Sequence, residues 1–281
     1  MREGAILSIS SQVVRGHVGN SAAAFALRRL GIEVYEVPTL IWNHHPGHGA
    51  PMGLVVASDV LADLLEKFSS GSWSSEIAMV ISGYMREAVQ VRIVAEAIAR
   101  LKAREPRILY VLDPVSGDRA GPYVPGDVIE AIGRHLVPLA DAITPNRFEL
   151  AFLLKAPLGG NLEIMQAVDA LKAPMALVSS AHAEHQGNVA NLLVSGSTAS
   201  LIETPALPHA PKGTGDLLTA LFAGRLKLKQ SPLEAAAHAV AAVHDVICQS
   251  NDSGQDELAL VKAQARLAAP TTLPLIKAQP R

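Results

Sequence analysis

The sequence predicts an α/β protein of three layers, α/β/α, whose central sheet is mostly parallel and has an antiparallel edge. Three observations support this fold class. Short apolar runs of strand length alternate with longer segments of helical periodicity along most of the chain. The first strand, helix and strand, within residues 5–37, form a unit typical of parallel pairing. After residue 179, two strand-like segments flank Ser195-Gly196-Ser197, which indicates an antiparallel hairpin. We expect one domain spanning residues 1–281.

Composition narrows the class of protein. The chain has 281 residues, of which 49% are hydrophobic, enough for a large core. The formal net charge of -2 gives no bulk attraction to nucleic acid or to anionic lipid, so neither is an expected partner. Cys248 is the single cysteine, which excludes an intramolecular disulfide and favours a reducing compartment. With no signal peptide or membrane span in the sequence, we expect a cytoplasmic protein.

The predicted strands are short and apolar, and most of them run into polar residues. They fall at residues 5–9, 33–37, 77–81, 108–112, 142–144, 176–179, 189–194 and 198–203. The predicted helices have apolar faces bounded by capping or breaking residues. They fall at residues 19–30, 55–68, 86–103, 128–136, 161–171, 214–228, 233–249 and 256–267. The tail, residues 270–281, is expected to be loosely held.

The most informative stretch is Lys212-Gly213-Thr214-Gly215-Asp216, a glycine turn directly before a predicted helix. The unpaired N–H groups and the dipole of a helix N-terminus bind phosphate well. A carboxylate does not bind phosphate, so Asp216 has two interpretations. It is either the base that takes a proton from an attacking hydroxyl, or a capping residue of a buried helix. These residues alone leave both open.

Two carboxylates follow the strand predicted at residues 108–112. Asp113 and Asp118 lie in a loop shaped by Pro114 and Gly117, and such a pair can hold Mg²⁺ directly or through water. The alternative is one helix cap and one solvated carboxylate. The segment at residues 119–126 is a candidate lid.

Two other predicted strands also end in polar groups. Tyr84 comes just after the strand at residues 77–81, where open α/β sheets bind ligands. Thr144 ends the strand at 142–144, and Pro145 favours a first helical turn after it, so Thr144 is the predicted cap, with Glu149 further along.

The loop at residues 42–49 contains three histidines in five residues, which suggests a metal site. No carboxylate or cysteine lies nearby in the sequence to complete such a site. We therefore favour a flexible flap that presents polar and aromatic groups to a substrate.

Taken in order, several segments resemble one family. They are residues 6–21 with Val14-Arg15-Gly16-His17-Val18-Gly19-Asn20, then Ser82-Gly83-Tyr84, residues 113–118, Tyr123-Val124-Pro125, residues 139–149 and Gly213-Thr214-Gly215-Asp216. The set resembles the pyridoxal kinases, a branch of the ribokinase-like superfamily, over nearly the whole chain up to Gly254. The resemblance implies a homodimer that uses ATP to phosphorylate the 5′-hydroxymethyl group of pyridoxal, pyridoxine or pyridoxamine in vitamin B6 salvage.

The resemblance also implies roles for individual residues. Asp216 would be the base, and Gly213, Thr214 and Gly215 the anion hole. Substrate contacts would come from Ser11, Val18, Trp42, His45, Pro46 and Tyr84. ATP contacts would come from Asp113, Asn146, Ser179, Lys212 and Thr214. The Mg²⁺ that accompanies ATP, and a possible K⁺, would lie near Asp113, Asp118, Thr144 and Glu149.

One departure from the family pattern leaves the vitamer preference open. The family loop usually reads Asn-His-Thr-Gly, and here it is His44-His45-Pro46-Gly47. Pro46 has neither the hydroxyl nor the N–H of a threonine. Two alternatives therefore remain. One is a kinase of the same fold that acts on hydroxymethylpyrimidine or another small molecule. The other is a low-turnover pyridoxal phosphate carrier, which the intact Asp216 argues against.

Overall fold

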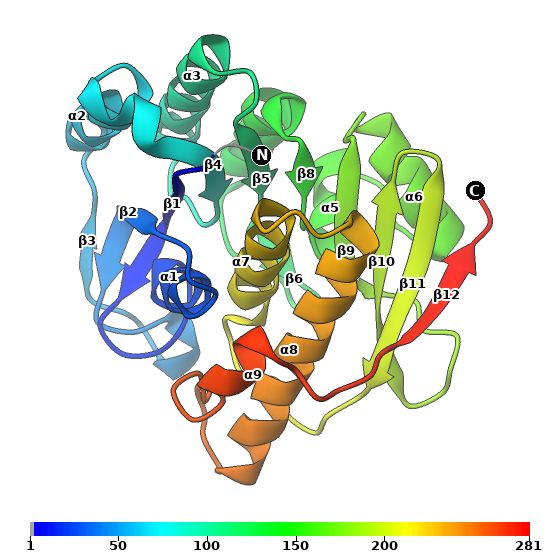
Figure 1. Ribbon diagram of the computed structural model, residues 1–281. Helices are drawn as coiled ribbons and strands as arrows, with labels where there is room; N and C mark the ends of the chain where they lie inside the picture. Colours follow the sequence, from blue (N-terminus) through cyan, green and yellow to red (C-terminus); the bar gives the residue numbers. More distant parts are fainter. Residues whose placement is uncertain (1–2) are drawn as a thin grey trace.

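The computed structural model describes residues 3–281 and contains one ten-stranded sheet, in the order β12-β11-β10-β9-β8-β5-β4-β1-β2-β3. The six central strands, β9, β8, β5, β4, β1 and β2, are parallel to one another. Strands β10, β11 and β12 at one edge and β3 at the other pair antiparallel with their neighbours. In Figure 1, β12 lies beside β11 at one edge and β3 at the other. The predicted mostly parallel sheet with an antiparallel edge is confirmed. The strands are β1 Ala5–Val13, β2 Val34–Trp42, β3 Gly53–Val55, β4 Ile77–Ser82, β5 Leu109–Leu112, β8 Ala142–Ile143, β9 Met175–Ala181, β10 Asn188–Ser195, β11 Thr198–Pro205 and β12 Leu275–Gln279.

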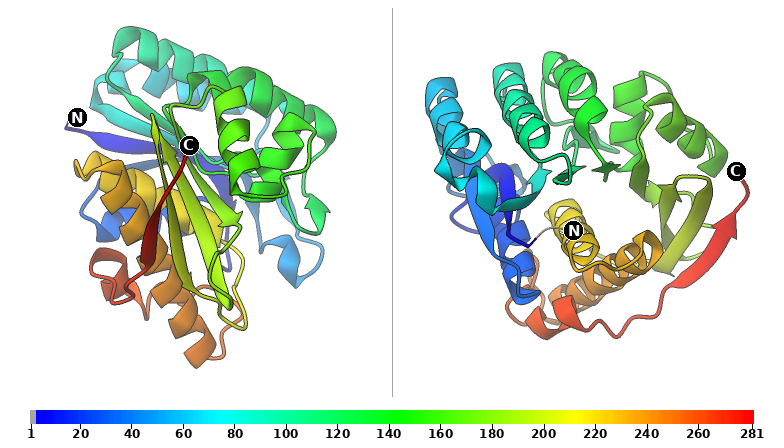
Figure 2. Two further views of the ribbon diagram at one scale, coloured as in Figure 1. Left: turned by 90° about the vertical axis from the view of Figure 1, so that its right-hand side faces the viewer. Right: turned by 45° about the horizontal axis from the view of Figure 1, so that its top comes forward.

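Helices cover both faces of the sheet, as Figure 2 shows. The helices are α1 Asn20–Arg29, α2 Ser58–Ser69, α3 Ala88–Arg104, α4 Gly126–Ala131, α5 Arg147–Leu154, α6 Asn161–Ala170, α7 Thr214–Lys227, α8 Pro232–Asp252 and α9 Gln264–Ala268. Successive strand side chains point to opposite faces, so the sheet feeds two apolar clusters. In β1, Leu7 and Ile9 join the cluster under α2, α3, α4 and α6, and Ile6 joins the one under α1, α7 and α8. The three-layer prediction is confirmed.

The first two strands are longer than predicted. β1 continues to Val13, and its register with β2 shifts between Ser10 and Gln12, so residues expected in a loop form part of the ladder. β2 continues to Trp42 and pairs with β3, so the helix predicted from residue 55 begins at Ser58. Backbone pairing with buried neighbours compensates for the polar character of these residues, a tertiary effect that local patterning does not reveal.

The C-terminal predictions were wrong in two respects. The helix predicted at residues 256–267 is reduced to α9, because the segment before it turns and Glu257 bonds to distant loops. The tail is not loosely held, since β12 pairs with β11. Asp245 on α8 also holds the start of the tail, accepting hydrogen bonds from the backbone N–H groups of Thr271 and Thr272 at 2.6 and 3.2 Å.

Smaller differences occur in the middle of the chain. The helix predicted at residues 128–136 begins at Gly126 and ends in a π-helical turn over Ile132–Leu136. The candidate lid, residues 119–126, contains strand β7 Gly121–Pro122, which forms a hairpin with β6 Gly117–Asp118 just before it. Helix α5 had no predicted bounds. Within residues 3–281, no helix combines the length and the apolar character needed to cross a membrane.

Candidate active site

The site lies where the carboxyl ends of β1, β4 and β5 meet the N-terminus of α7. Gly213 precedes α7 with φ of +95°, and a Cβ there would overlap the His17 carbonyl oxygen. Gly19 has φ of +56°, and a Cβ there would overlap the Ser11 carbonyl oxygen. Glycine is therefore required at both turns. The Gly19 N–H donates a hydrogen bond to the Asp216 carboxylate.

Three carboxylates face one another here. Burial, together with the nearby charges of Glu149 and Asp216, raises the pKa of Asp113 well above its usual range. Burial raises the pKa of Glu149 to about 7, although backbone N–H groups of Asn146, Ser116 and Gly117 bond to it. Burial likewise raises the pKa of Asp216 to about 6. Such concentrated negative charge in a dry site is costly unless protons or cations neutralise it.

Hydroxyl groups connect these carboxylates to the sheet. Thr219 on α7 donates to Asp113 Oδ2 at 3.1 Å, and Thr144 Oγ1 lies 2.7 Å from Thr219 Oγ1. Thr144 was predicted to cap the helix that follows it, α5, but it does not do so. Asn146 is the cap, and it forms a capping box with Glu149. The Asn146 amide also donates to the Gly117 carbonyl at 2.8 Å, which leaves one of its two N–H groups for a ligand.

The donor set suits a hard cation. Asp113, Glu149 and Thr144 offer oxygen ligands, and the groups that donate to the two carboxylates in residues 3–281 are neutral hydroxyl and backbone N–H groups. Magnesium and monovalent cations prefer oxygen, and a cation would offset the repulsion between the carboxylates.

Asp118 has different hydrogen-bond partners from Asp113, and a cation shared by the two stays a prediction. The Lys212 ammonium lies 3.0 Å from Asp118 Oδ2, and the Tyr123 hydroxyl donates to the same oxygen. Lys212 also lies 3.2 Å from the Tyr123 hydroxyl. These contacts tie the β6–β7 hairpin to the glycine turn before α7.

An aromatic pair borders the other side of the site. The rings of Trp42 and Tyr84 lie 6.3 Å apart between centroids. The backbone of Tyr84 is fixed from both sides, since its N–H donates to Ser10 Oγ at 3.1 Å and its carbonyl accepts from Thr39 at 2.7 Å. Of the other predicted substrate residues, Ser11 is buried in β1, Val18 is half-buried, and Pro46 is exposed.

The histidine loop has a carboxylate partner after all, because Glu257 arrives from the other end of the chain. Its Oε1 lies 3.1 Å from His45 Nε2 and 2.6 Å from His48 Nε2. The three potential ligand atoms lie within 4.8 Å of one another, a spacing that a metal ion could use. A carboxylate is therefore available to complete a metal site, contrary to the argument from the sequence. The hydrogen bonds to Glu257 also hold the loop in place, whereas a flexible flap was predicted.

The hydrogen bonds nevertheless favour protons over a metal in this cluster. The Gly47 N–H donates to His45 Nδ1 at 3.0 Å, so that nitrogen must carry a lone pair. Burial, the largest effect, lowers the pKa of His45, which keeps the ring neutral with its proton on Nε2. A metal bound at Nε2 would move that proton to Nδ1, against the Gly47 N–H. We interpret His45, His48 and Glu257 as a hydrogen-bonded pin.

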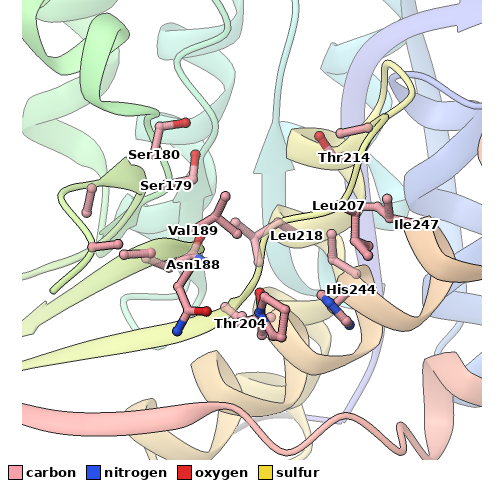
Figure 3. Close-up of a pocket in the computed structure, with 18 of the residues that line it drawn as sticks. Ser179, Ser180, Asn188, Val189, Thr204, Leu207, Thr214, Leu218, His244 and Ile247 are labelled. Atoms are coloured by element: carbon pink, nitrogen blue, oxygen red, sulfur yellow. The ribbon is translucent and has the colours of Figure 1, made fainter. Parts of the chain in front are cut away.

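A second cavity, of about 380 Å³, opens between the ends of β9 to β11 and the helices α7 and α8 (Figure 3). The predicted ATP residues Ser179 and Thr214 line it, as does Gly215, whereas Asp113, Asn146 and Lys212 do not. Sequence reasoning missed His244 and Thr204, which also line it. His244 lies on the alanine-rich helix α8, for which the sequence predicts only a packing role. Thr204 lies near the end of strand β11.

Comparison with known proteins places this geometry in a family. The sequence model described as phosphomethylpyrimidine kinase matches residues 57–260. Pyridoxal kinase PdxY of Leifsonia xyli is 35% identical over 271 residues, which cover 94% of this chain and 96% of the relative. The homologue from Rubrobacter xylanophilus is 36% identical, with 94% of each chain covered.

Solved structures agree with these sequence matches. Pyridoxal kinase from Leishmania donovani in complex with ADP and pyridoxamine superimposes with a TM-score of 0.92 at 25% identity, covering 99% of this chain and 100% of the other. The ribokinase-like fold follows from this likeness. The chain carries the phosphomethylpyrimidine kinase domain and belongs to the pyridoxal kinase family.

Proposed function

We propose that this protein transfers the γ-phosphoryl group of ATP to the 5′-hydroxymethyl group of pyridoxal, with pyridoxine and pyridoxamine as further acceptors. The observation that carries this proposal is the position of one helical turn between two cavities. Thr214 and Gly215 line the cavity of about 380 Å³, and the next residue, Asp216, lines a small one of about 20 Å³ with Ser10 and Gly83, which has room for a hydroxyl group but not for a whole vitamer. A nucleotide in the larger cavity and an acceptor hydroxyl in the smaller one would meet at the N-terminus of α7.

In this proposal the protein contributes position, charge and a base. The N–H groups of Gly213, Thr214 and Gly215 form the anion hole, supported by the helix dipole. Asp216, with a pKa of about 6, is mostly ionised at neutral pH and accepts the hydroxyl proton. General-base help of this kind contributes about 10² to 10⁴ in rate. Lys212, held beside Asp118, supplies positive charge next to the same turn.

Cations complete the charge balance. Bound with ATP, Mg²⁺ neutralises negative charge that develops on the phosphoryl group. Asp113 and Glu149 would hold it, with Asp118 available if Lys212 turns to phosphate. A monovalent cation such as K⁺ fits the oxygens of Thr144 and Glu149. Asn146 and Ser179 remain proposed ATP contacts.

The vitamer would bind on the aromatic side of Asp216. Trp42 and Tyr84 offer faces to a pyridine ring, with Ser11 and Val18 close to the Gly19 turn. The pinned loop places His45 and Pro46 at the rim of this region. Because Pro46 lacks a hydroxyl, selection among vitamers would rest on the aromatic pair and on His45.

We further propose that the chain acts as a single-domain protomer in a cytoplasmic homodimer. Exposed apolar side chains gather beside β2 and β3, where the exposed fractions of Val14, Met52 and Leu54 are 80%, 75% and 54%. A second copy could cover this surface. Light scattering would measure the mass, and Leu54→Arg should shift a dimer toward monomer. An unchanged mass would place the interface elsewhere.

The decisive experiment measures ATP consumption with pyridoxal, pyridoxine, pyridoxamine, hydroxymethylpyrimidine and ribose. Turnover with B6 vitamers is expected. Turnover only with hydroxymethylpyrimidine would favour the second candidate, which the matching family model suggests. Tight pyridoxal phosphate binding without any turnover would favour a carrier.

Asp216→Asn should lower kcat at least about 100-fold while the fold survives. Asp59→Asn is the matched control, since Asp59 also lies in the first turn of a helix, α2, away from the site. If both variants kept near-normal kcat, Asp216 would not be the base.

A further inference from the structure

We propose that His244 selects adenine over 6-oxo purines, by accepting a hydrogen bond from the 6-amino group of the base at its Nε2 atom. This inference rests on the proposed function in one respect: it takes the cavity of about 380 Å³ as the nucleotide site. It adds a specificity-determining residue and fixes which nitrogen of that residue carries a proton.

A hydrogen-bond relay from the C-terminal tail sets the tautomer of His244. The Thr272 hydroxyl donates its only proton to Asp245 Oδ1, at 2.5 Å. The oxygen of that hydroxyl can then only accept from His244 Nδ1, which lies 2.8 Å away. Nδ1 must therefore carry the proton, and in the neutral ring Nε2 carries the lone pair.

Asp245 is a firm anchor for this relay. Besides Thr272, it accepts two bonds from Thr271, from the backbone N–H at 2.6 Å and from the hydroxyl at 3.1 Å. These bonds keep the pKa of Asp245 below its usual value, although burial acts in the opposite direction. The Cys248 sulfur, 3.7 Å from His244 Nδ1, is a weaker neighbour and does not compete with the hydroxyl.

The Nε2 atom of His244 is left without a hydrogen-bond partner although solvent does not reach it. A buried acceptor that makes no bond costs free energy, and such groups usually have a partner. His244 lines the cavity, and a base that moves the side chains covering Nε2 can provide the missing donor. Figure 3 shows its ring beside the cavity, with Leu207 and Leu218 lying between it and Thr214.

This arrangement separates a phosphate end from a base end. Thr214 and Gly215, at the N-terminus of α7, suit phosphate. Val243, Ile247 and Leu207 give apolar contacts near His244, which suit the faces of a purine. A base placed among them would present its edge to Nε2.

The chemistry of that edge decides which nucleotide fits. Adenine carries an amino group at C6 and donates to the lone pair. Hypoxanthine and guanine carry an oxo group there, so two acceptors would face each other. A site that provides a buried acceptor penalises a ligand without the matching donor. We expect kcat/KM for ATP to exceed that for ITP at least about tenfold.

The test compares ATP and ITP, which differ in the group at C6, at pH 8 with pyridoxal as acceptor and with calorimetric binding of both nucleotides. His244→Phe should lower the ATP to ITP ratio by about tenfold through the KM of the nucleotide, and leave the KM of pyridoxal unchanged. Thr272→Val should lower the ratio too, because Nδ1 loses its acceptor and the proton can move to Nε2. His238→Phe, on the same helix but away from the cavity, should change neither value.

The outcomes separate this inference from the proposed function. Normal ATP turnover with an unchanged ATP to ITP ratio in both His244→Phe and Thr272→Val would overturn the role of His244 alone. Absence of ATP turnover in the unmodified protein would overturn the kinase, and the calorimetric ratio would still decide the base preference. If His244→Phe fails to fold, Thr272→Val and its ratio carry the test.

Discussion

Replacing Glu149 with glutamine should flatten the pH dependence of stability in buffers without coordinating cations. Burial raises the pKa of Glu149 from 4.5 to about 7 in the folded protein. A carboxyl whose folded pKa is raised stabilises the fold below the unfolded pKa, and this contribution is lost as pH rises through the folded pKa. Between pH 5 and pH 8 the wild-type free energy of unfolding should therefore fall by about 2 to 3 kcal/mol on account of this group.

Glutamine also brings a cost that does not depend on pH. Glu149 accepts from the N–H groups of Ser116 and Asn146, at 3.0 and 2.8 Å on its two oxygens. In Glu149→Gln, the amide nitrogen of the new side chain would face one of these donors, at a cost of about 1 to 3 kcal/mol. The informative quantity is accordingly the difference between pH 5 and pH 8, and not the stability at either pH.

Urea unfolding at both pH values, in tetramethylammonium buffer, measures this difference. Glu203→Gln is the matched control. Glu203 is also buried, but bonds from Glu184, Asn188 and His185 outweigh burial and lower its pKa below 4.5, so its contribution to stability stays constant between pH 5 and pH 8. Adding K⁺ or Mg²⁺ at pH 8 should stabilise the wild type more than Glu149→Gln. Parallel pH profiles for wild type and Glu149→Gln would refute the reasoning.

Three further predictions follow from the same contacts. Wild-type kcat/KM should fall as pH drops below about 6, because the base Asp216 becomes protonated; a flat profile from pH 5 to 8 would argue against that role. Gly213→Ala should lower stability by at least about 2 kcal/mol and raise the KM of ATP, through its clash with His17. Gly31 also has a positive φ, but open space surrounds it. The thermal stability of Gly31→Ala therefore measures the cost of backbone strain without a clash. Glu257→Gln should raise the KM of pyridoxal but not of ATP, since it weakens the loop pin, and equal changes in both would contradict this.

Local sequence predicted those parts of the fold whose signal is local. Apolar runs located every strand of the parallel centre, and the hairpin signal located the antiparallel edge at β10 and β11. Helix α7 begins at Thr214, as the glycine turn before it predicts. These elements follow from periodicity and turn chemistry, which a few neighbouring residues contain.

Contacts between distant parts of the chain account for what was missed. The residues before α9 have helical periodicity, yet Glu257 reaches His45 and His48, more than 200 positions away. Nothing near the histidines indicates that carboxylate. The tail reads as loose because its strand, β12, forms only against the edge of β11. The tautomer of His244 likewise depends on that tail.

The structure also bears on the question that the glycine turn left open, whether Asp216 is a cap or a base. In α5 and α8 the acidic residue at the third helical position, Glu149 or Glu234, bonds back to the N-cap N–H in a capping box. In α7 the N-cap is Gly213, which makes no side-chain cap bond, and the Asp216 carboxylate accepts from the N–H of Gly19 as well as from its own backbone N–H. A residue kept only to cap its own helix would bond as the two glutamates do. The different partner of Asp216, and its place in the polar cavity beside α7, favour a carboxylate held ready for a ligand's proton.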